Sequence, residues 1–340
     1  MKILVIADPF VPVPPVNYGG SERIVDLMCR GLAARGHRVS LLAGPGSADY
    51  GGGLRVHRPP TAAYASRAFR KIWFQFILAQ EALTADVVIN HGRLDYLELL
   101  YRTARPVVHW FHTPLTGRET AFVRQRRRQG DYFVGVSHSQ VACGPGDFQV
   151  IHNALETQHL PFFATPAAPA YLLFLGRLTR QKGVHLAIAA ARQAGRKLVL
   201  AGNISREAGG AEYFEAEVRP HLGPQCEWTG PYDEARRREV LAGASALLFP
   251  IQGAEAFGLV MIEALASGVP VIALRRDATP EIVSEGRNGF LCDSVGDMVA
   301  AIGRLGEISR AACRASVEER FGAAGFVDQV EKLITHVCAA

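Results

Sequence analysis

Residues 171–190, YLLFLGRLTRQKGVHLAIAA, combine an apolar run, a basic loop and a helical pattern in that order. The run Tyr171–Leu175 is short and continuously apolar, which is typical of a strand buried on both faces of a parallel sheet. A loop bounded by Gly176 and Gly183 follows, and apolar residues at helical spacing begin at Val184. The stretch therefore predicts one strand–loop–helix unit of an α/β protein.

The same alternation of strands and helices extends over most of the chain. Gly19, Gly20 and Ser21 open the clearest helix, residues 21–35, whose apolar positions follow helical spacing. The sequence therefore predicts two Rossmann-like, doubly wound parallel sheets, which bind ligands at the carboxyl ends of their strands and would face each other across a cleft. The predicted strands are residues 2–7, 38–43, 54–57, 86–90, 106–111, 132–136, 171–175, 197–201, 226–228, 245–249, 270–273 and 290–292.

A proline-rich loop, residues 165–169, interrupts this pattern before the strand at Tyr171. We therefore expect a first domain of residues 1–163 and a second domain of residues 164–321, joined within the segment 160–169. The 340 residues, of which 49% are hydrophobic, suffice for two domains of ordinary size.

The cysteines and the N-terminal residues favour a cytoplasmic protein. Six cysteines, at positions 29, 143, 226, 292, 313 and 338, show neither C-x-x-C nor His/Cys spacing typical of metal sites, which fits reduced thiols. Lys2 leads directly into only four apolar residues, too few for the core of a signal peptide. The sequence contains no run of 18 apolar residues, so a transmembrane helix is not expected.

The net charge of +5 is compatible with nucleic acid, an anionic membrane or a phosphorylated substrate as partner. Arg67, Arg70 and Lys71 precede an apolar run, so residues 66–78 fit either a helix on a bilayer surface or an ordinary helix packed on the sheet. The five arginines between 118 and 128 fit either a solvated helix face or a site for a phosphorylated or lipid-linked acceptor.

Arg177 and Lys182, five residues apart, lie on the loop that follows Tyr171–Leu175. Arg177 and Lys182 would therefore lie at the carboxyl end of a strand, where an α/β sheet binds ligands. An Arg fork and a Lys point charge can together bind a diphosphate, although a solvated basic loop explains the same residues.

Glu255 and Glu263 flank the start of a predicted helix after the strand 245–249. If residues 255–263 were all helical, the two side chains would lie about 12 Å apart along the axis and roughly 80° apart around it. That spacing fits a folded nucleotide-sugar, with its diphosphate on the free backbone N–H groups of Phe257, Gly258 and Leu259. Two unrelated glutamates in an amphipathic helix are the ordinary alternative.

Taken together, these motifs resemble glycosyltransferase family 4, the retaining nucleotide-sugar transferases with the GT-B fold. The resemblance covers nearly the full chain, and only the combination of motifs is specific. It implies that a C-terminal helix, about residues 322–340, packs back onto the first domain. The matching segments are Gly19-Gly20-Ser21-Glu22-Arg23, Arg35-Gly36-His37-Arg38-Val39, the loop from Gly176 to Gly183, Glu255 to Glu263, and Ser267-Gly268-Val269-Pro270-Val271.

The resemblance assigns roles to residues on both halves of the chain. It implies that Glu255 contacts the donor sugar, Glu263 holds the ribose hydroxyls, and Arg177 and Lys182 bind the donor diphosphate. His112, at the end of the predicted strand 106–111, would touch the sugar near its reacting carbon.

The donor site implied by the resemblance also includes glycines and backbone groups. No acceptor-binding residue is assigned. The further donor-binding residues are Gly19, Gly20, Gly176, Phe257, Gly258 and Leu259.

The resemblance implies a retaining hexosyltransferase that moves a sugar from a UDP- or GDP-sugar to a glycan, lipid-linked or small-molecule acceptor in polysaccharide or glycoconjugate biosynthesis. The acceptor attacks from the face that the nucleotide leaves, and the departing phosphate takes the acceptor proton. No D-x-D motif occurs, so neither a metal nor another cofactor is expected. We expect a cytoplasmic enzyme, with a peripheral position on the inner face of the plasma membrane as an alternative, and no nucleic-acid partner. The sequence specifies neither the donor base, the acceptor nor the oligomeric state.

Other functions share parts of this pattern. A dinucleotide-dependent oxidoreductase is disfavoured because G-x-G-x-x-G is absent. A GT-B sugar-nucleotide epimerase or a glycan phosphorylase remains an alternative. A non-catalytic glycan- or nucleotide-binding protein of the same descent is the other, although the presence of His112, Glu255 and Lys182 argues against it.

Overall fold

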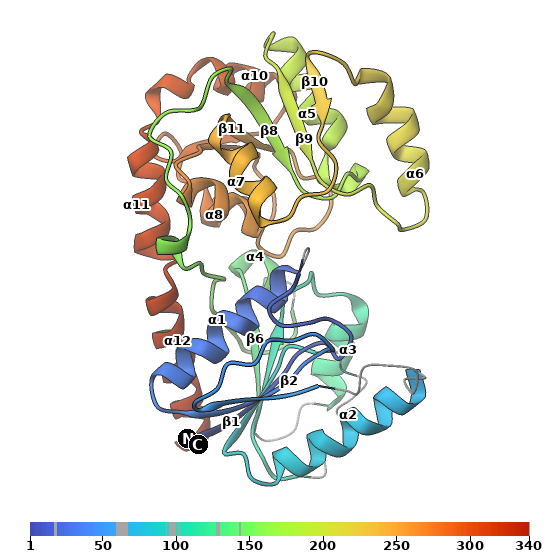
Figure 1. Cartoon of the computed structure of the whole chain (residues 1–340), viewed down its shortest axis with the longest axis vertical. Coiled ribbons are helices and arrows are strands. Elements are labelled where there is room, and N and C mark those ends of the chain that lie inside the picture. Colours follow the sequence, from blue (N-terminus) through green and yellow to red (C-terminus); the bar gives the residue numbers. More distant parts are fainter. Residues whose placement is uncertain are drawn as a thin grey trace. The chain divides into compact units, whose positions relative to one another are not determined.

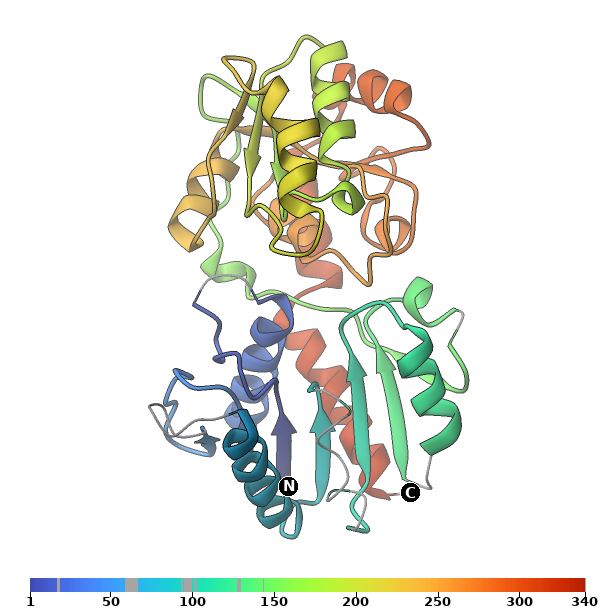
Figure 2. The same ribbon diagram turned by 90° about the vertical axis from the view of Figure 1, so that its right-hand side faces the viewer.

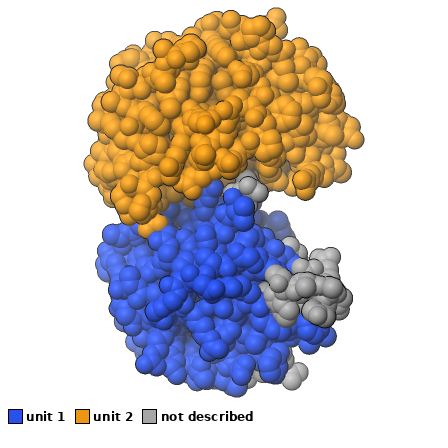
Figure 3. Space-filling model, viewed as in Figure 1, with its two compact units in different colours: residues 1–154, 323–340 blue, residues 155–322 orange. Residues whose placement is uncertain are grey.

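The computed structural model describes residues 1–16, 19–58, 67–92, 94, 100, 103–126, 130–142 and 144–339. The chain divides into two compact units, residues 1–154 with 323–340 and residues 155–322 (Figure 3). Each unit is a parallel sheet with helices on both faces, so the predicted fold class is confirmed. Within the described residues, no helix is both long and apolar enough to cross a membrane.

The sheet of unit 1 has the strand order β3-β2-β1-β4-β5-β6-β7, and its strands pair in parallel. The order reverses between β1 and β4, because the chain builds outward first on one side of β1 and then on the other. The strands are β1 (Lys2–Ile6), β2 (Arg38–Leu42), β3 (Leu54–His57), β4 (Val87–Asn90), β5 (Val107–Phe111), β6 (Asp131–Gly135) and β7 (Phe148–Val150).

Helices cover both faces of this sheet (Figures 1 and 2). Helices α1 and α12 pack on each other on one face, so closely that a Cβ on Gly31 would lie 2.4 Å from Val327. On the other face, Phe74 and Leu78 of α2 pack into a cluster with Leu4. The helices of unit 1 are α1 (Gly20–Ala34), α2 (Arg67–Ala82), α3 (Gly117–Arg126), α4 (His138–Val141) and α12 (Ala323–Ala339).

The sheet of unit 2 has the order β10-β9-β8-β11-β12-β13, again with parallel pairs. The order reverses between the neighbouring strands β8 and β11. The strands are β8 (Tyr171–Leu175), β9 (Leu198–Ala201), β10 (Cys226–Trp228), β11 (Ala244–Phe249), β12 (Val271–Leu274) and β13 (Gly289–Cys292).

The helices of unit 2 form two packed groups. Helix α10 packs on α5, and α11 packs on α8. The α-helices are α5 (Val184–Gln193), α6 (Gly210–Tyr213), α7 (Glu234–Ala242), α8 (Leu259–Ala266), α9 (Thr279–Ile282), α10 (Val295–Gly303) and α11 (Arg310–Arg320); a π-helical turn spans Phe214–Val218, and 3₁₀ turns span Thr157–His159, Arg180–Lys182, Arg219–His221 and Leu305–Glu307.

The predicted elements agree closely with the observed ones. Each of the predicted strands is present with both ends within one residue of the prediction, and the helix predicted over 21–35 is observed as Gly20–Ala34. Strand β7 was not predicted, because Phe148-Gln149-Val150 is short and lies beside a Gly- and Pro-containing stretch.

The chain passes from unit 1 to unit 2 between residues 154 and 155, before the proline-rich loop, and returns between 322 and 323. Residues 155–163, which lie between this crossing point and the proline-rich loop, are attached to unit 2 by hydrogen bonds. The guanidinium of Arg314 donates to the carbonyls of Thr157 and Leu160, and the N–H of Phe163 donates to the carbonyl of Ser267. These bonds explain why the segment 155–163 belongs to unit 2.

The loop after β8 is held against the end of β11 by a close backbone contact. Gly183 has φ 74°, and a Cβ at this position would lie 1.8 Å from the carbonyl oxygen of Pro250. Next to it, the carbonyl of Gln181 accepts hydrogen bonds from the N–H groups of Gln252 (2.7 Å) and Gly253 (3.0 Å). The two loops that carry Lys182 and Glu255 are therefore joined through their backbones.

We predict that Gly183→Ala destabilises the protein more than Gly195→Ala. Both glycines have positive φ, which costs alanine roughly 1–2 kcal/mol, but Gly195 has no atom within 4 Å of its added Cβ. The clash with Pro250 should add about 1–3 kcal/mol to the loss of unfolding free energy in the Gly183 variant. Urea unfolding of both variants measures the difference, and equal losses would contradict the close contact.

Candidate active site

The charged residues of interest in unit 2 lie at one edge of its sheet. Because its strands are parallel, the loops that follow β8, β9, β11 and β12 all leave from their carboxyl ends. The order of the sheet reverses between β8 and β11, and ligands of open α/β sheets bind at such a reversal. Loops 176–183 and 250–258 lie at this point.

Lys182 and Glu255 form an ion pair across these two loops. The lysine Nζ also lies 6.0 Å from the centre of the Phe249 ring, at the end of β11. The side chains are only 25% and 14% exposed, so both charges are partly shielded from water. The structure thus brings together two residues that are 73 positions apart in sequence and were selected independently from it.

Asp277, which the sequence analysis did not identify, supports the loop that carries Glu255. Its carboxylate accepts a hydrogen bond from the backbone N–H of Glu255 at 3.1 Å. Asp277 has φ 47°, the only positive φ among the described residues other than glycine. Aspartate tolerates this conformation better than most residues, but no sequence spacing indicates it.

Arg177, on the same loop as Lys182, has a different partner. Its guanidinium pairs with Glu207, on the loop after β9, at 2.7 Å. The two side chains are 39% and 72% exposed, and an ion pair of this kind stabilises a protein by about 0–1 kcal/mol. An anionic ligand can therefore replace Glu207 as the partner of Arg177 at little cost.

Glu263 lies on α8 and is buried. The helix begins at Leu259 with Gly258 (φ 94°) as its N-cap, so Glu255 precedes the helix and the spacing calculated for a continuous helix does not apply. The carboxylate of Glu263 accepts a hydrogen bond from Arg237 of α7 at 3.0 Å, and the two residues are 4% and 5% exposed. Arg237 was not predicted from the sequence, because it lies in a row of three arginines, 236–238, that gives no sign of burial.

In unit 1, His112 follows β5 and His91 follows the neighbouring strand β4. Nε2 of His112 and Nδ1 of His91 share a hydrogen bond of 2.7 Å, and the ring centres lie 5.0 Å apart. Burial lowers the pKa of His112 to about 4 and lowers the pKa of His91 well below its usual value, with the neighbouring His112 adding to the shift. Both rings are therefore neutral near pH 7.

His109 lies on the opposite face of the sheet from this pair, as the strand alternation predicts. It is 1% exposed, and its ring stacks on Phe133 at 5.6 Å. This environment fits the prediction that His109 is a structural residue of the sheet.

Gly19 and Gly20, at the start of α1, belong to the connection that leaves the carboxyl end of β1, at the reversal point of the unit 1 sheet. Gly20 is the first residue of the helix and Gly19 its N-cap; a Cβ on Gly19 would lie 2.6 Å from Pro15 and 2.8 Å from the carboxylate of Glu22. Burial raises the pKa of Glu22. The Pro-containing loop therefore packs tightly against the start of α1.

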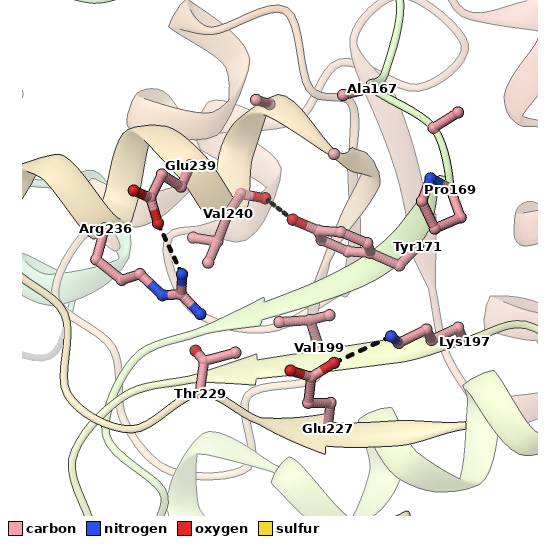
Figure 4. Close-up of a pocket in the computed structure, with 13 residues that line it drawn as sticks. Ala167, Pro169, Tyr171, Lys197, Val199, Glu227, Thr229, Arg236, Glu239 and Val240 are labelled. Atoms are coloured by element: carbon pink, nitrogen blue, oxygen red, sulfur yellow. Dashed lines mark hydrogen bonds and ion pairs between the residues drawn. The ribbon is translucent and has the colours of Figure 1, made fainter. Parts of the chain in front are cut away.

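A hollow of about 260 Å³ in unit 2 is lined by residues outside loops 176–183 and 250–258 (Figure 4). It is bordered by Tyr171 and Lys197, at the beginnings of β8 and β9, and by Arg236 on α7. The charged groups around it are already paired, Lys197 with Glu227 and Arg236 with Glu239.

The two halves of the chain match two glycosyltransferase families. Residues 18–159 match "Glycosyltransferase Family 4" and residues 169–307 match "Glycosyl transferases group 1". With the two Rossmann-like sheets, these matches define the class: the chain belongs to the glycosyltransferases of family 4 type, with a GT-B fold.

Known proteins of this class resemble the chain over most of its length. Glycogen synthase of Mycobacterium tuberculosis is 27% identical, with 86% of this chain and 82% of that protein covered. Sucrose-phosphate synthase from Thermosynechococcus elongatus superposes with a TM-score of 0.81 at 19% identity over 99% of both chains. HepE of Anabaena, solved in complex with UDP and glucose, superposes with a TM-score of 0.76 at 17% identity over 99% of this chain and 100% of its own.

We predict that Arg237→Met lowers the free energy of unfolding by roughly 3 kcal/mol, because it leaves the buried charge of Glu263 without this guanidinium. Arg236→Met on the same helix should cost less than about 1 kcal/mol, since the pair of Arg236 with Glu239 is exposed. Urea unfolding of the two variants provides the measurement. Similar losses in both would show that burial of the Arg237–Glu263 pair has no energetic consequence.

Proposed function

We propose that the protein is a retaining glycosyltransferase that moves a sugar from a UDP- or GDP-sugar to a glycan, lipid-linked or small-molecule acceptor. The observation that carries the proposal is the Lys182–Glu255 pair at the reversal point of the unit 2 sheet. An ion pair there provides a cation for a diphosphate and a carboxylate for sugar hydroxyls on adjoining loops.

The donor would bind to unit 2 by exchanging existing contacts for new ones. Arg177 and Lys182 would bind the diphosphate, and the N–H groups at the start of α8 would supply further donors. Glu255, released from part of its interaction with Lys182, would accept hydrogen bonds from the sugar. Glu263 would hold the ribose hydroxyls, with Arg237 keeping its carboxylate in place.

The same cations would stabilise the leaving group. Negative charge builds on the diphosphate as the glycosidic bond breaks, and fixed positive groups in a partly shielded site offset it. The acceptor hydroxyl would attack from the face that the diphosphate leaves, and its proton would pass to the departing phosphate oxygen. The sugar then keeps its anomeric configuration without a protein base.

We further propose that transfer needs no metal ion. The chain has no D-x-D motif, and Arg177 and Lys182 can supply the charge that a divalent cation provides in other transferases. His112 would contact the donor sugar through a neutral ring. A neutral imidazole offers one donor and one acceptor, which suits a hydroxyl.

We predict that Glu255→Ala and His112→Ala each lower the transfer rate by about 10²- to 10³-fold while the fold is kept. A thermal-shift screen of nucleoside diphosphates and nucleotide-sugars first identifies the donor, because a bound ligand stabilises the protein. Acceptor-dependent release of the nucleoside diphosphate, with EDTA present, then measures transfer and distinguishes it from epimerisation.

The matched controls are Glu239→Ala and His336→Ala, which alter exposed residues of units 2 and 1. Both should transfer sugar at the wild-type rate. Wild-type turnover by the Glu255 and His112 variants would refute the site, and donor binding without any transfer would favour the non-catalytic alternative. Loss of activity in EDTA that Mg²⁺ or Mn²⁺ restores would refute metal independence.

We also propose that the protein works at the inner surface of the plasma membrane, through helix α2. Phe69, Ile72 and Phe76 are 43%, 66% and 63% exposed, and Leu83 just beyond the helix is 66% exposed. Their spacing places them on one face, opposite the face that packs Phe74 and Leu78 into the core. Three basic residues lie in the first half of α2, which contains no acidic residue in its first turn.

We predict that the protein sediments with vesicles containing anionic lipid at low salt and is partly released at high salt, because exposed charges are then screened. Ile72→Ser with Phe76→Ser should weaken this binding at least about tenfold, since two apolar side chains no longer enter the bilayer. Phe162→Ser, which changes an exposed phenylalanine of unit 2, is the control. Absence of binding at low salt would end this proposal.

A further inference from the structure

The two histidines at the ends of β4 and β5 form a pair whose chemistry the proposed roles do not use. Asn90 of β4 lies opposite His109 of β5 in the parallel register, so the residues that follow, His91 and Trp110, also lie side by side. Their rings are 5.3 Å apart. Trp110 in turn contacts Phe326 of α12 at 5.8 Å, so helix α12 packs against the group that contains the pair.

The outer nitrogens of the pair are enclosed. Nε2 of His91 and Nδ1 of His112 are buried, and neither has a hydrogen-bond partner among the described residues. Neither ring carries a charge near neutral pH, since burial lowers the pKa of both. The two rings therefore carry two N–H protons on four nitrogens, and one of these protons lies in the shared hydrogen bond.

This count restricts the tautomers of both rings. If Nδ1–H of His91 donates, Nε2 of His112 accepts and the proton of His112 must lie on Nδ1. If Nε2–H of His112 donates instead, the proton of His91 must lie on its own Nε2. In either case the two rings have the same tautomer, because the bond joins Nδ1 of one ring to Nε2 of the other.

We propose that His91 is a positioning residue for the transfer reaction: its Nδ1 fixes the ring orientation and the tautomer of His112. The proposal rests on the role of His112 proposed above. A histidine that contacts a sugar hydroxyl must present a hydrogen-bond donor or acceptor at a fixed place. In a free neutral imidazole the proton moves between the two ring nitrogens, so that donor and acceptor change places. The hydrogen bond of 2.7 Å from His91 ties the tautomer of His112 to that of His91, so that His112 cannot exchange its donor and acceptor alone before the nucleotide-sugar binds.

Nuclear magnetic resonance tests the tautomers without any substrate. In protein labelled with ¹⁵N-histidine, two-bond ¹H–¹⁵N correlations distinguish Nδ1–H, Nε2–H and doubly protonated rings among the eleven histidines. His91→Asn and His112→Asn assign the two rings by loss of signals. We expect the same single tautomer for both at pH 7; different tautomers, rapid averaging or a charged ring would overturn the proposal even if the enzyme is active.

Two variants of His91 separate positioning from packing. His91→Phe keeps a flat ring beside Trp110 but has no nitrogen, whereas His91→Asn places an amide near the position of Nδ1 and lacks the ring. We expect His91→Phe to lower kcat by roughly 10- to 100-fold with little change in the KM for the donor, and His91→Asn to recover most of the loss. The spectrum of His91→Phe should also show His112 as a mixture of tautomers.

His336→Phe, on the exposed side of α12, controls for the addition of an aromatic ring and should leave kcat unchanged. If His91→Phe is as active as the wild type, or if it retains more activity than His91→Asn, His91 acts by packing and the proposal fails. If no transfer is detected in any form of the protein, the proposed function fails, while the shared tautomer in the wild-type spectrum still tests the histidine pair.

Discussion

Parallel pairing of β8 with β11 is the constraint on which the candidate site of unit 2 depends. The first residues of the two strands are 73 positions apart in the sequence, yet the strands lie side by side and end at the same edge of the sheet. The carbonyl of Gln181 accepts hydrogen bonds from the loop after β11 at this edge. Only a glycine fits between the two loops at position 183. Lys182 and Glu255 meet because the backbones beneath them are joined, so the ion pair is a consequence of the sheet and not its cause.

The two units place charge differently at their strand ends. In unit 2, Lys182 and Glu255 are charged groups that a ligand can separate. In unit 1, burial holds the His91 and His112 rings neutral, and their hydrogen bond orders them without charge. The proposed function would use both environments, since a diphosphate needs cations and a sugar hydroxyl needs a directed donor or acceptor.

Most of the fold could be predicted from the sequence, because buried parallel strands are short apolar runs with glycine-containing loops between them. Strand β7 lacks such a run and was missed. The site was only partly predictable. Spacing and strand-end position selected Lys182 and Glu255, but the partners Arg237, Asp277 and His91 come from other elements and depend on register. His91 had a usable signal, since it follows one predicted strand as His112 follows the next.

Helix α12 has a consequence for the order in which the protein folds during synthesis. Its residues complete unit 1: Arg35 and His37 pair with Glu331, and Phe326 packs on Trp110. Because these residues are synthesised after unit 2, unit 2 can finish folding while the α1 face of the unit 1 sheet still lacks its second helix. The apolar surface on this face of the unit 1 sheet therefore stays uncovered until α12 has been synthesised.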